Sequence, residues 1–415
     1  MKRTFTMLIA FISIHSSGFA QLSLEECQQL ARENYPMIKR LDLIEKSKEM
    51  NLSNAVKAYL PQLSITGMAS LIDGMPEISM PGATSESNNH QFIGIANLTQ
   101  TIWDGGVTRS QRKITSASAE VEKQNIEVLL YDINERINQL YFGVLMIDEQ
   151  LKQLSILDDN LSRSLKRAET ARAGGVAYRS DLDAIKVEIL NSEQTRINLN
   201  AQRQAYIQML SVMIKKDIPN YTTLSIPAEI PITNNNINRP ELRLYEQQRL
   251  LSDLQNTAIT ARYLPKVGLT GYAIGLTPGI KSGIDKTDHL LIAGISLSWN
   301  IGGFYTKKND RNIIRTNMLK IDNQQEIFLF NTGLELTQAN NQIDRSRQLM
   351  LKDDEIVQLR ESIKRSSEIK YENGACTMSD LLNDISAESM ARQNKALHEM
   401  EYLMYLYSHK TISGN

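Results

Sequence analysis

Apolar residues between positions 126 and 168 recur in alternating steps of four and three, which is the 3.5-residue period of a coiled-coil seam. Asp158 alone interrupts the row, whose members are Ile126, Leu130, Ile133, Ile137, Leu140, Val144, Ile147, Leu151, Leu154, Leu161, Leu165 and Ala168. We predict one helix from Gly106 to Arg172, about 100 Å long at about 1.5 Å per residue. A rod with one narrow apolar stripe must pack on neighbouring rods, because it cannot bury itself in a compact domain.

A weaker seam follows a turn at 173–181 and predicts an antiparallel return helix. Its members are Leu182, Ile185, Ile189, Ser192, Arg196, Leu199, Arg203, Tyr206 and Leu210. The polar members fit a rod with one side facing water. An ordinary antiparallel bundle explains the same pattern and stays open at this point.

The prolines indicate an internal duplication. Pro36 and Pro240 lie as far apart as Pro61 and Pro265 (240 − 36 = 265 − 61 = 204), and windows 82–218 and 279–415, equal in length, contain no proline. Because proline disrupts helix interiors, we expect long helices in both windows. The chain therefore reads as a first repeat (21–218), a linker (219–238) and a second repeat (239–415). Each repeat has a helix (24–58; 241–262), a β-hairpin (60–103; 264–299) and a long helical hairpin (106–218; 302–412).

The second strand of each β-hairpin is apolar on one side. The apolar positions are Phe92, Gly94, Ala96, Leu98 and Ile102 in the first repeat, and Leu291, Ala293, Ile295, Leu297 and Trp299 in the second. Such strands suit a barrel wall between lipid and water, and their lengths match a tilted membrane strand. Four strands cannot close a barrel, and open edges do not occur in lipid, so we predict an oligomer in which three chains supply twelve strands. Two hairpins packed on a soluble core are the alternative.

Both tryptophans of the chain stand where a strand gives way to a helix. The segment TIWDGGVTR contains Trp103, Gly105 and Gly106, and LSWNIGGFYTK contains Trp299, Gly302 and Gly303. Glycine adopts the positive φ that such a corner needs, and tryptophan is typical of a membrane interface. Simple core packing is the alternative for each tryptophan.

The remaining composition narrows the class of protein. Residues 1–20 have the basic start, short apolar core and small-residue cleavage site of a signal peptide. A net charge of −1 gives no sign of nucleic-acid binding. We interpret Cys27 and Cys376 as free thiols.

The ordered set of features resembles the outer-membrane efflux proteins of the TolC type. The likeness rests on LSLEECQQLARENYP, on the corner in both halves, and on the turns ARAGGVAYRSDLDAIKVE and KYENGACTMSDLLNDISAE. It implies a mixed, mainly α fold, in which long antiparallel coiled-coil helices form a periplasmic α-barrel. Four β-strands per chain would join a trimeric, 12-stranded outer-membrane β-barrel. The implied function is a homotrimeric export duct of a tripartite efflux or type I secretion system in a Gram-negative outer membrane. Its implied partners are a periplasmic adaptor (membrane fusion) protein, an inner-membrane pump of the RND or ABC type, and outer-membrane lipid.

The resemblance also implies roles for residues at the two turns. The periplasmic gate would include Ser180, Asp181, Tyr371 and Asp380, while Asn383 and Cys376 depart from the family's acidic and basic residues. A Tyr371–Asp181 hydrogen bond would tie the hairpins. Burial and the mutual repulsion of three Asp380 carboxylates around the trimer opening would raise their pKa. The tips that would meet an adaptor are Gly175, Val176, Ala177, Gly374 and Ala375. Helix capping by Asp181 and glycine-dependent turns are the structural alternatives.

The sequence does not suggest an enzyme. His90, His289, His398 and His409 lack ligand-spaced partners, so we expect no metal site, and no motif indicates a cofactor. A periplasmic coiled-coil adaptor or scaffold without a channel is the alternative function. A soluble helical enzyme is a third reading, which the missing site argues against.

Overall fold

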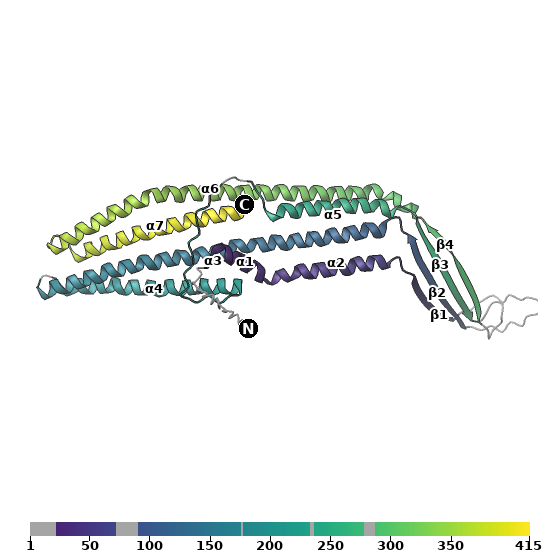
Figure 1. Cartoon of the computed structure of the whole chain (residues 1–415), viewed down its shortest axis with the longest axis horizontal. Helices are drawn as coiled ribbons and strands as arrows, with labels where there is room; N and C mark the ends of the chain where they lie inside the picture. The colour runs from purple at the N-terminus through teal and green to yellow at the C-terminus, as the bar shows by residue number, and fades with distance from the viewer. Residues whose placement is uncertain (1–21, 72–89, 176, 233–235, 278–286) are drawn as a thin grey trace, which may run out of the picture. The chain divides into compact units, whose positions relative to one another are not determined.

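The computed structural model describes residues 22–71, 90–175, 177–232, 236–277 and 287–415 (Figure 1). The predicted signal peptide lies outside these residues. The elements are α1 (Leu24–Asn34), η1 (Pro36–Ile38), α2 (Lys39–Lys57), β1 (Gln62–Leu71), β2 (His90–Trp103), α3 (Val107–Ala173), α4 (Arg179–Ile214), α5 (Pro240–Arg262), β3 (Lys266–Thr277), β4 (Asp288–Ser298), η2 (Ile301–Tyr305), α6 (Lys307–Glu372) and α7 (Met378–Ser413). The predicted mainly α class with four strands is confirmed. None of the described helices combines the length and apolarity needed to cross a membrane.

The chain divides into two compact units. A helical unit comprises Met1–Ile38, Leu130–Asn238 and Thr332–Asn415, and a sheet unit comprises Lys39–Leu129 and Arg239–Asn331. The long helices α3 and α6 contribute to both units.

The first predicted helix is interrupted. We expected one helix over 24–58, but α1 ends at Asn34 and α2 begins at Lys39, with the short 3₁₀ turn η1 between them. Tyr35, which precedes Pro36, is extended at φ −65° and ψ 131°. The proline ring disfavours helical backbone at the residue before it. The break therefore has a local cause, which is visible in the sequence as Pro36.

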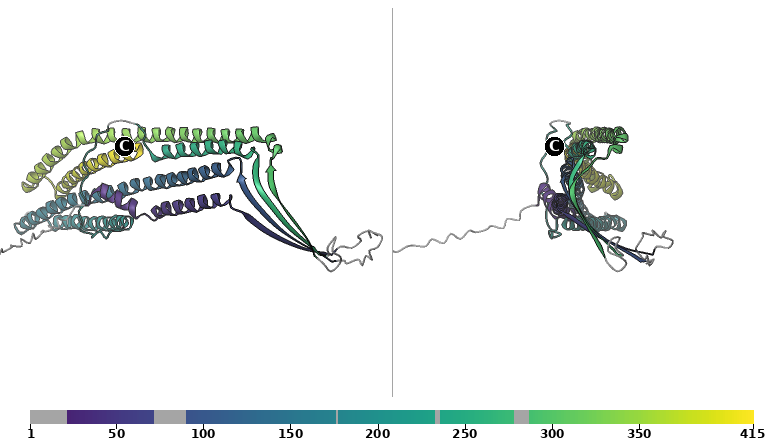
Figure 2. Two further views of the ribbon diagram at one scale, coloured as in Figure 1. Left: turned by 45° about the vertical axis from the view of Figure 1, so that its right-hand side comes forward. Right: turned by 90° about the vertical axis from the view of Figure 1, so that its right-hand side faces the viewer.

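The sheet unit is built around one antiparallel sheet of strand order β1-β2-β3-β4. Figure 2 shows these strands from two further directions as a single curved layer. The register pairs Leu63 with Leu98, Leu98 with Gly271, and Ala273 with Leu291, so the apolar positions predicted for β2 and β4 lie on one face of the sheet. Large side chains on this face are exposed, including Ile65 at 76% and Leu291 at 82%. The sheet therefore presents an uncovered apolar surface.

The helical unit is held together by the seam that the sequence predicted. Among the seam residues of α3, none is exposed, and Ile137 and Ala168 are fully buried. Leu182, Ile185 and Leu199 of α4 are buried as well. A cluster at the far end joins Leu161, Ala168, Leu182 and Ile185 to Met378, Leu381, Leu382 and Ile385 of α7. This cluster positions the two interhelical turns.

Candidate functional site at the hairpin tips and the corners

A cavity of about 770 Å³ lies between the α3–α4 turn and the α6–α7 turn of the helical unit. Its wall brings together Asp181, Tyr371, Ala177, Gly374 and Cys376, which the resemblance had singled out. The other predicted residues that the structure describes do not line it: Ser180, Asp380, Asn383, Gly175 and Ala375. Val176 lies outside the described residues. The structure therefore groups only part of the predicted gate and tips.

Asp181 is a helix cap in this structure. Its carboxylate accepts a hydrogen bond of 3.0 Å from the backbone N–H of Tyr178 at the start of α4. No hydrogen bond joins it to Tyr371 among the described residues, so the protomer does not contain the predicted tie. Burial, followed by the charge of Asp181, raises the pKa of Tyr371. The charge of Asp181 therefore acts on the Tyr371 hydroxyl through space, without a hydrogen bond between the two side chains.

Asp380 caps α7 in the same way. Its carboxylate accepts hydrogen bonds from Thr377 Oγ1 at 2.6 Å and from the Thr377 backbone N–H at 3.0 Å, while Thr377 Oγ1 accepts from the Asp380 backbone N–H at 3.1 Å. These bonds from Thr377 hold the pKa of Asp380 below its usual range. In the protomer the pKa shift is downward, because the side chain is exposed and caps a helix; the predicted upward shift concerned three Asp380 carboxylates in a trimer.

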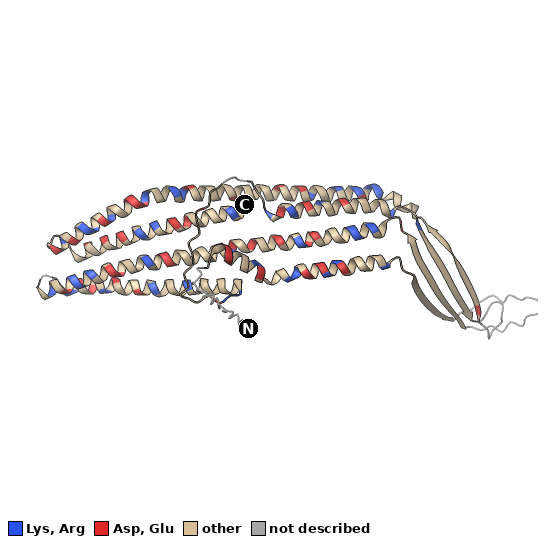
Figure 3. Ribbon diagram, viewed as in Figure 1, with Lys and Arg blue, Asp and Glu red and all other residues tan. Residues whose placement is uncertain are grey.

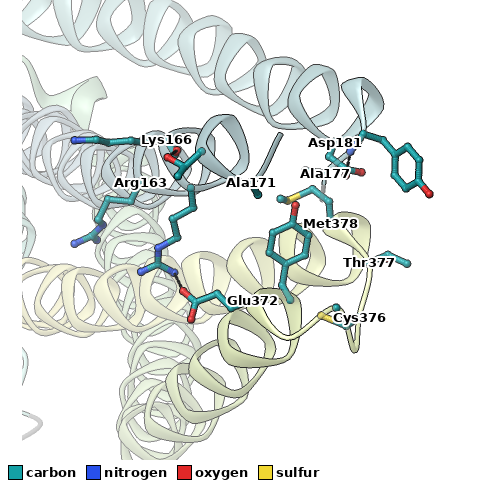
Figure 4. Close-up of a pocket in the computed structure, with 14 residues that line it drawn as sticks. Arg163, Lys166, Ala171, Ala177, Asp181, Glu372, Cys376, Thr377 and Met378 are labelled. Carbon is teal, nitrogen blue, oxygen red and sulfur yellow. Dashed lines mark hydrogen bonds and ion pairs between the residues drawn. The ribbon is translucent and has the colours of Figure 1, made fainter. Parts of the chain in front are cut away.

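The two hairpins are tied by contacts that the sequence reasoning missed. Arg167 of α3 lies 3.8 Å from a carboxylate oxygen of Glu368 and 3.5 Å from one of Glu372, both on α6. Figure 4 draws Glu372 in the cavity wall, with a dashed line for its ion pair. The two glutamates stand one helical turn apart, so their i,i+4 spacing was the signal that could have revealed a shared basic partner.

Cys376 has a structural environment in place of the expected ion pair. Its thiol donates to the backbone carbonyl of Ser367 at 3.5 Å, and Ser367 Oγ donates to Asp384 at 2.5 Å. Burial, with a contribution from the charge of Asp380, raises the pKa of the Cys376 thiol. Both Cys376 and Cys27 are free, as predicted.

The first corner is organised by Asp104. Its carboxylate accepts hydrogen bonds from the backbone N–H groups of Gly106 and Thr108, at 2.9 and 2.6 Å, and from Tyr59 Oη at 3.0 Å. Burial opposes ionisation, but these hydrogen bonds hold the pKa of Asp104 below its usual value. Gly105 and Gly106 have φ of 71° and 87°, as the sequence predicted. A Cβ on Gly105 would lie 2.7 Å from Leu264 Cβ, so the corner has no room for a side chain there.

The second corner resembles the first in sequence but differs from it in geometry. Ile301–Tyr305 form the 3₁₀ turn η2, and neither Gly302 nor Gly303 has a positive φ. A Cβ on Gly303 would meet the Tyr263 ring at 2.8 Å, whereas one on Gly302 would meet only Asn300 at 3.6 Å. Gly303 is therefore needed for close packing, and Gly302 is not.

The tyrosine of each YLP segment closes its own corner. Tyr59 donates to Asp104, and Tyr263 donates to Asp310 at 2.7 Å. Trp299 Nε1 donates to the Tyr263 carbonyl at 3.1 Å, and both tryptophans are about half exposed. The tryptophans thus lie at the surface of the corners, and the core-packing alternative does not describe them.

The described residues contain no group of three or more histidine, cysteine, aspartate or glutamate side chains placed to hold a metal ion. His398 Nδ1 lies 2.8 Å from Asp353, which makes it one partner of a polar pair between α7 and α6.

Comparison with known proteins identifies the first half of the chain. Residues 28–214 match the family model described as outer membrane efflux protein. Over this segment the chain is similar to the outer membrane efflux protein family. The match confirms the resemblance seen in the sequence, and with it the expectation that the chain is not an enzyme. No curated protein matches the chain.

Solved efflux channels share the fold over nearly the whole chain. The outer-membrane channel OprN is 14% identical, covers 94% of this chain and 89% of its own, and gives a TM-score of 0.70. CusC is 13% identical, with coverage of 95% and 92% and a TM-score of 0.70. The outer membrane channel CmeC of Campylobacter jejuni is 13% identical, with coverage of 95% and 86% and a TM-score of 0.68. The fold of outer-membrane channels therefore extends through both halves.

Proposed function

We propose that the chain is the export duct of a tripartite efflux or type I secretion system in a Gram-negative outer membrane. It works as a homotrimer with a periplasmic adaptor and an inner-membrane pump of the RND or ABC type. The family match of residues 28–214 and the channel fold of both halves support this function. The observation that carries it is the uncovered apolar face of the sheet.

The sheet also leaves two edges open. The strands β1 and β4 each pair on one side only, within the residues described. Unpaired backbone groups in lipid cost several kcal/mol each, so an open sheet cannot remain in a bilayer. Pairing β4 of one chain with β1 of the next removes every edge when three chains meet, and twelve strands enclose a lumen.

The hairpin tips provide the periplasmic end of the proposed duct. The cavity lined by Asp181 and Tyr371 lies beside the Arg167 ion pairs, so the mutual position of the two tips depends on partly exposed charges. Such ties are weak enough to rearrange, each contributing about 0–1 kcal/mol. The exposed turn residues Gly175, Gly374 and Ala375 are proposed as the adaptor contact.

Adjacent residues on β4 supply the decisive experiment. Ile295 lies on the apolar face, and Ser296 lies on the opposite face. In the proposed barrel, Ile295→Lys puts a charge into lipid, which costs about 2–4 kcal/mol at the bilayer centre and less towards the interface, whereas Ser296→Lys points into an aqueous lumen. We expect Ile295→Lys to abolish heat-modifiable trimer in the outer-membrane fraction and Ser296→Lys to retain it, with conductance in planar bilayers.

The opposite results are equally clear. If the protein is a monodisperse, water-soluble monomer without detergent, the duct proposal is wrong and the function is that of a periplasmic adaptor or scaffold. Equal trimer yields for the two lysine variants would show that the apolar face does not meet lipid.

A further inference from the structure

Ten basic side chains gather where the helices of the sheet unit adjoin the strands. We name this set the basic collar: Lys57, Arg109, Arg112, Lys113, Arg262, Lys266, Lys307, Lys308, Arg311 and Arg315. The segments that contain it, 51–61, 104–116, 256–266 and 300–316, hold only two carboxylates, Asp104 and Asp310. Their net charge is 10 − 2 = +8, while the rest of the chain carries (46 − 10) − (47 − 2) = −9. The cations are therefore concentrated at the helix ends that adjoin the strands of the sheet unit.

Both carboxylates of these segments already accept hydrogen bonds from nearby groups. Asp104 accepts hydrogen bonds within its corner, and Asp310 accepts one from Tyr263 Oη. Among the described residues, no collar cation forms an ion pair with a carboxylate; Lys307 instead lies over the Tyr263 and Phe304 rings, at 5.5 and 5.3 Å. The other nine collar residues are exposed. The charge of the collar is thus left for an external partner.

The neighbours of the collar indicate what that partner is. The exposed apolar face of the sheet ends in Trp103 and Trp299, and Tyr305, six residues after Trp299 in the chain, is 88% exposed. Figure 3 shows strands almost without charge and basic residues on the adjoining helix ends. Within the strands the charged residues are Lys266 at this end and Asp288 at the other. The order apolar, aromatic, cationic is that of a protein surface passing from hydrocarbon into lipid headgroups.

The dimensions agree with this order. A bilayer has roughly 5–8 Å of headgroup region on each side of its hydrocarbon core. Lys113 lies six residues beyond the first residue of α3, a rise of about 9 Å, and Arg315 lies eight residues beyond the first residue of α6, a rise of about 12 Å. Long basic side chains bend towards the phosphate layer while their stems stay on apolar surface. A groove of about 670 Å³ between α2, α3 and α5 joins Arg109, Arg112 and Lys113 to the apolar side chains of Leu52 and Leu250.

We propose that the basic collar binds the headgroups of anionic phospholipids in the leaflet next to the helices, which is the periplasmic leaflet in the proposed duct. The partner is a lipid whose phosphodiester carries a net negative charge, such as phosphatidylglycerol. Arginine pairs with phosphate through two parallel hydrogen bonds, and lysine adds point charge. The inference rests on the proposed function for its orientation.

Four collar residues can be neutralised with little effect on the fold. Arg109, Arg112, Lys308 and Arg315 are exposed and take no part in the hydrogen bonds and ion pairs of the described residues. The collar variant changes all four to Gln. The control variant changes four exposed cations of the helical unit to Gln, with the same loss of charge: Lys186, Lys352, Arg360 and Lys370.

The test compares lipid retention by full-length protein in detergent. Wild type and both variants are incubated with equimolar phosphatidylglycerol and phosphatidylcholine of identical acyl chains, and bound lipid is counted by native mass spectrometry. We expect wild type to retain at least about three-fold more phosphatidylglycerol, a preference that 0.5 M salt reduces because exposed charges are then screened. The collar variant should bring the ratio to about one, and the control variant should leave it unchanged.

A second measurement separates the possible failures. If wild type retains both lipids equally, or if the control variant loses the preference as fully as the collar variant does, the collar does not bind anionic lipid. If instead the collar variant changes only the anion selectivity of channels in planar bilayers, the cations face the lumen and the inference is wrong while the duct stands. If wild type forms neither trimer nor channels, the proposed function itself fails.

Discussion

Asp158 of α3 and Arg196 of α4 form an ion pair across the first helical hairpin. Asp158 is the residue that breaks the apolar seam of the outgoing helix, and Arg196 breaks the seam of the returning one. Ser192, a buried break in the same return seam, also donates to Asp158. The polar interruptions of the two seams therefore meet each other, which fixes the register of the two helices.

We expect each single replacement in this pair to cost more than the double replacement. Asp158→Leu or Arg196→Leu leaves a half-buried charge facing an apolar side chain, and should lower the free energy of unfolding by about 1–2 kcal/mol. The double variant completes the α3 seam and places an apolar residue of α4 opposite it, and replacing such a pair by apolar residues is often neutral or stabilising. Thermal unfolding followed by far-UV circular dichroism gives the double-mutant cycle. Additive losses would show that the pair has no specific role.

The corner glycines should differ sharply in their tolerance of alanine. Gly105→Ala combines a positive φ with a contact of 2.7 Å, and Gly106→Ala has the strain of positive φ in open space. Gly303→Ala must displace the Tyr263 ring, while Gly302→Ala meets nothing closer than 3.6 Å. Left-handed backbone costs about 1–2 kcal/mol without glycine, so we expect folded yield in the order Gly302 above Gly106 above Gly105.

Membrane-fraction yield and unfolding temperature, measured side by side on the four alanine variants, check this order. Gly302→Ala serves as the matched control. A loss for Gly302→Ala as large as that for Gly105→Ala would mean that both corners share one geometry after all.

The corners also show what a sequence can reveal of this fold. The period of the α3 seam, the alternation of the strands and the repeated YLP segments gave the elements, because each pattern reflects burial on one face. Pro36 was overlooked as a break, although its effect on Tyr35 is local. The difference between the two Gly-Gly corners was not predictable, because it depends on whether Leu264 or the Tyr263 ring occupies the adjoining space.

The site was harder to predict than the fold for a related reason. Asp181 and Asp380 stand in sequences that serve equally for capping and for ion pairing, and the choice depends on which donors come within reach. The i,i+4 spacing of Glu368 and Glu372 indicates a position for a shared cation, but it does not indicate that Arg167, on a helix far away in the chain, supplies it.

The two thiols should react at very different rates. Burial, followed by the charge of Glu26, raises the pKa of Cys27 to about 12, and its side chain is fully buried. Cys376 is partly exposed, and burial raises its pKa as well. Because the thiolate is the nucleophile, a disulfide reagent at pH 8 should modify one thiol per folded chain, more slowly than free cysteine, and two in denaturant. Cys376→Ser should leave no rapidly modified thiol.

Stability should fall on mild acidification because of His409. This side chain is buried, its Nε2 has no hydrogen-bond partner in the described structure, and burial lowers its pKa below 6.5. The unfolded chain then binds a proton that the folded chain does not, so stability is present above pH 6.5 and is lost as pH falls towards the folded pKa. One proton gives a slope of at most about 1.4 kcal/mol per pH unit.

Chemical denaturation between pH 7.5 and 5 measures this slope. His409→Gln should flatten it, and His90→Gln, a change at an exposed residue, should not. An unchanged slope for His409→Gln would assign the acid sensitivity to other groups.

The arginine between the hairpins, and not the predicted Tyr371 bond, should control opening. Arg167 joins α3 to Glu368 and Glu372 of α6, whereas Asp181 is engaged in capping α4. Arg167→Gln removes two partly exposed ion pairs per chain, at roughly 0–1 kcal/mol each, and three chains would multiply the effect. We therefore expect Arg167→Gln to raise single-channel conductance in planar bilayers, and Tyr371→Phe to change it little. Asp181→Asn keeps an acceptor for the Tyr178 N–H and tests the cap without its charge. If Tyr371→Phe opens the channel as far as Arg167→Gln does, the tyrosine bonds to a group on a neighbouring chain, and the gate is made between chains instead of within one.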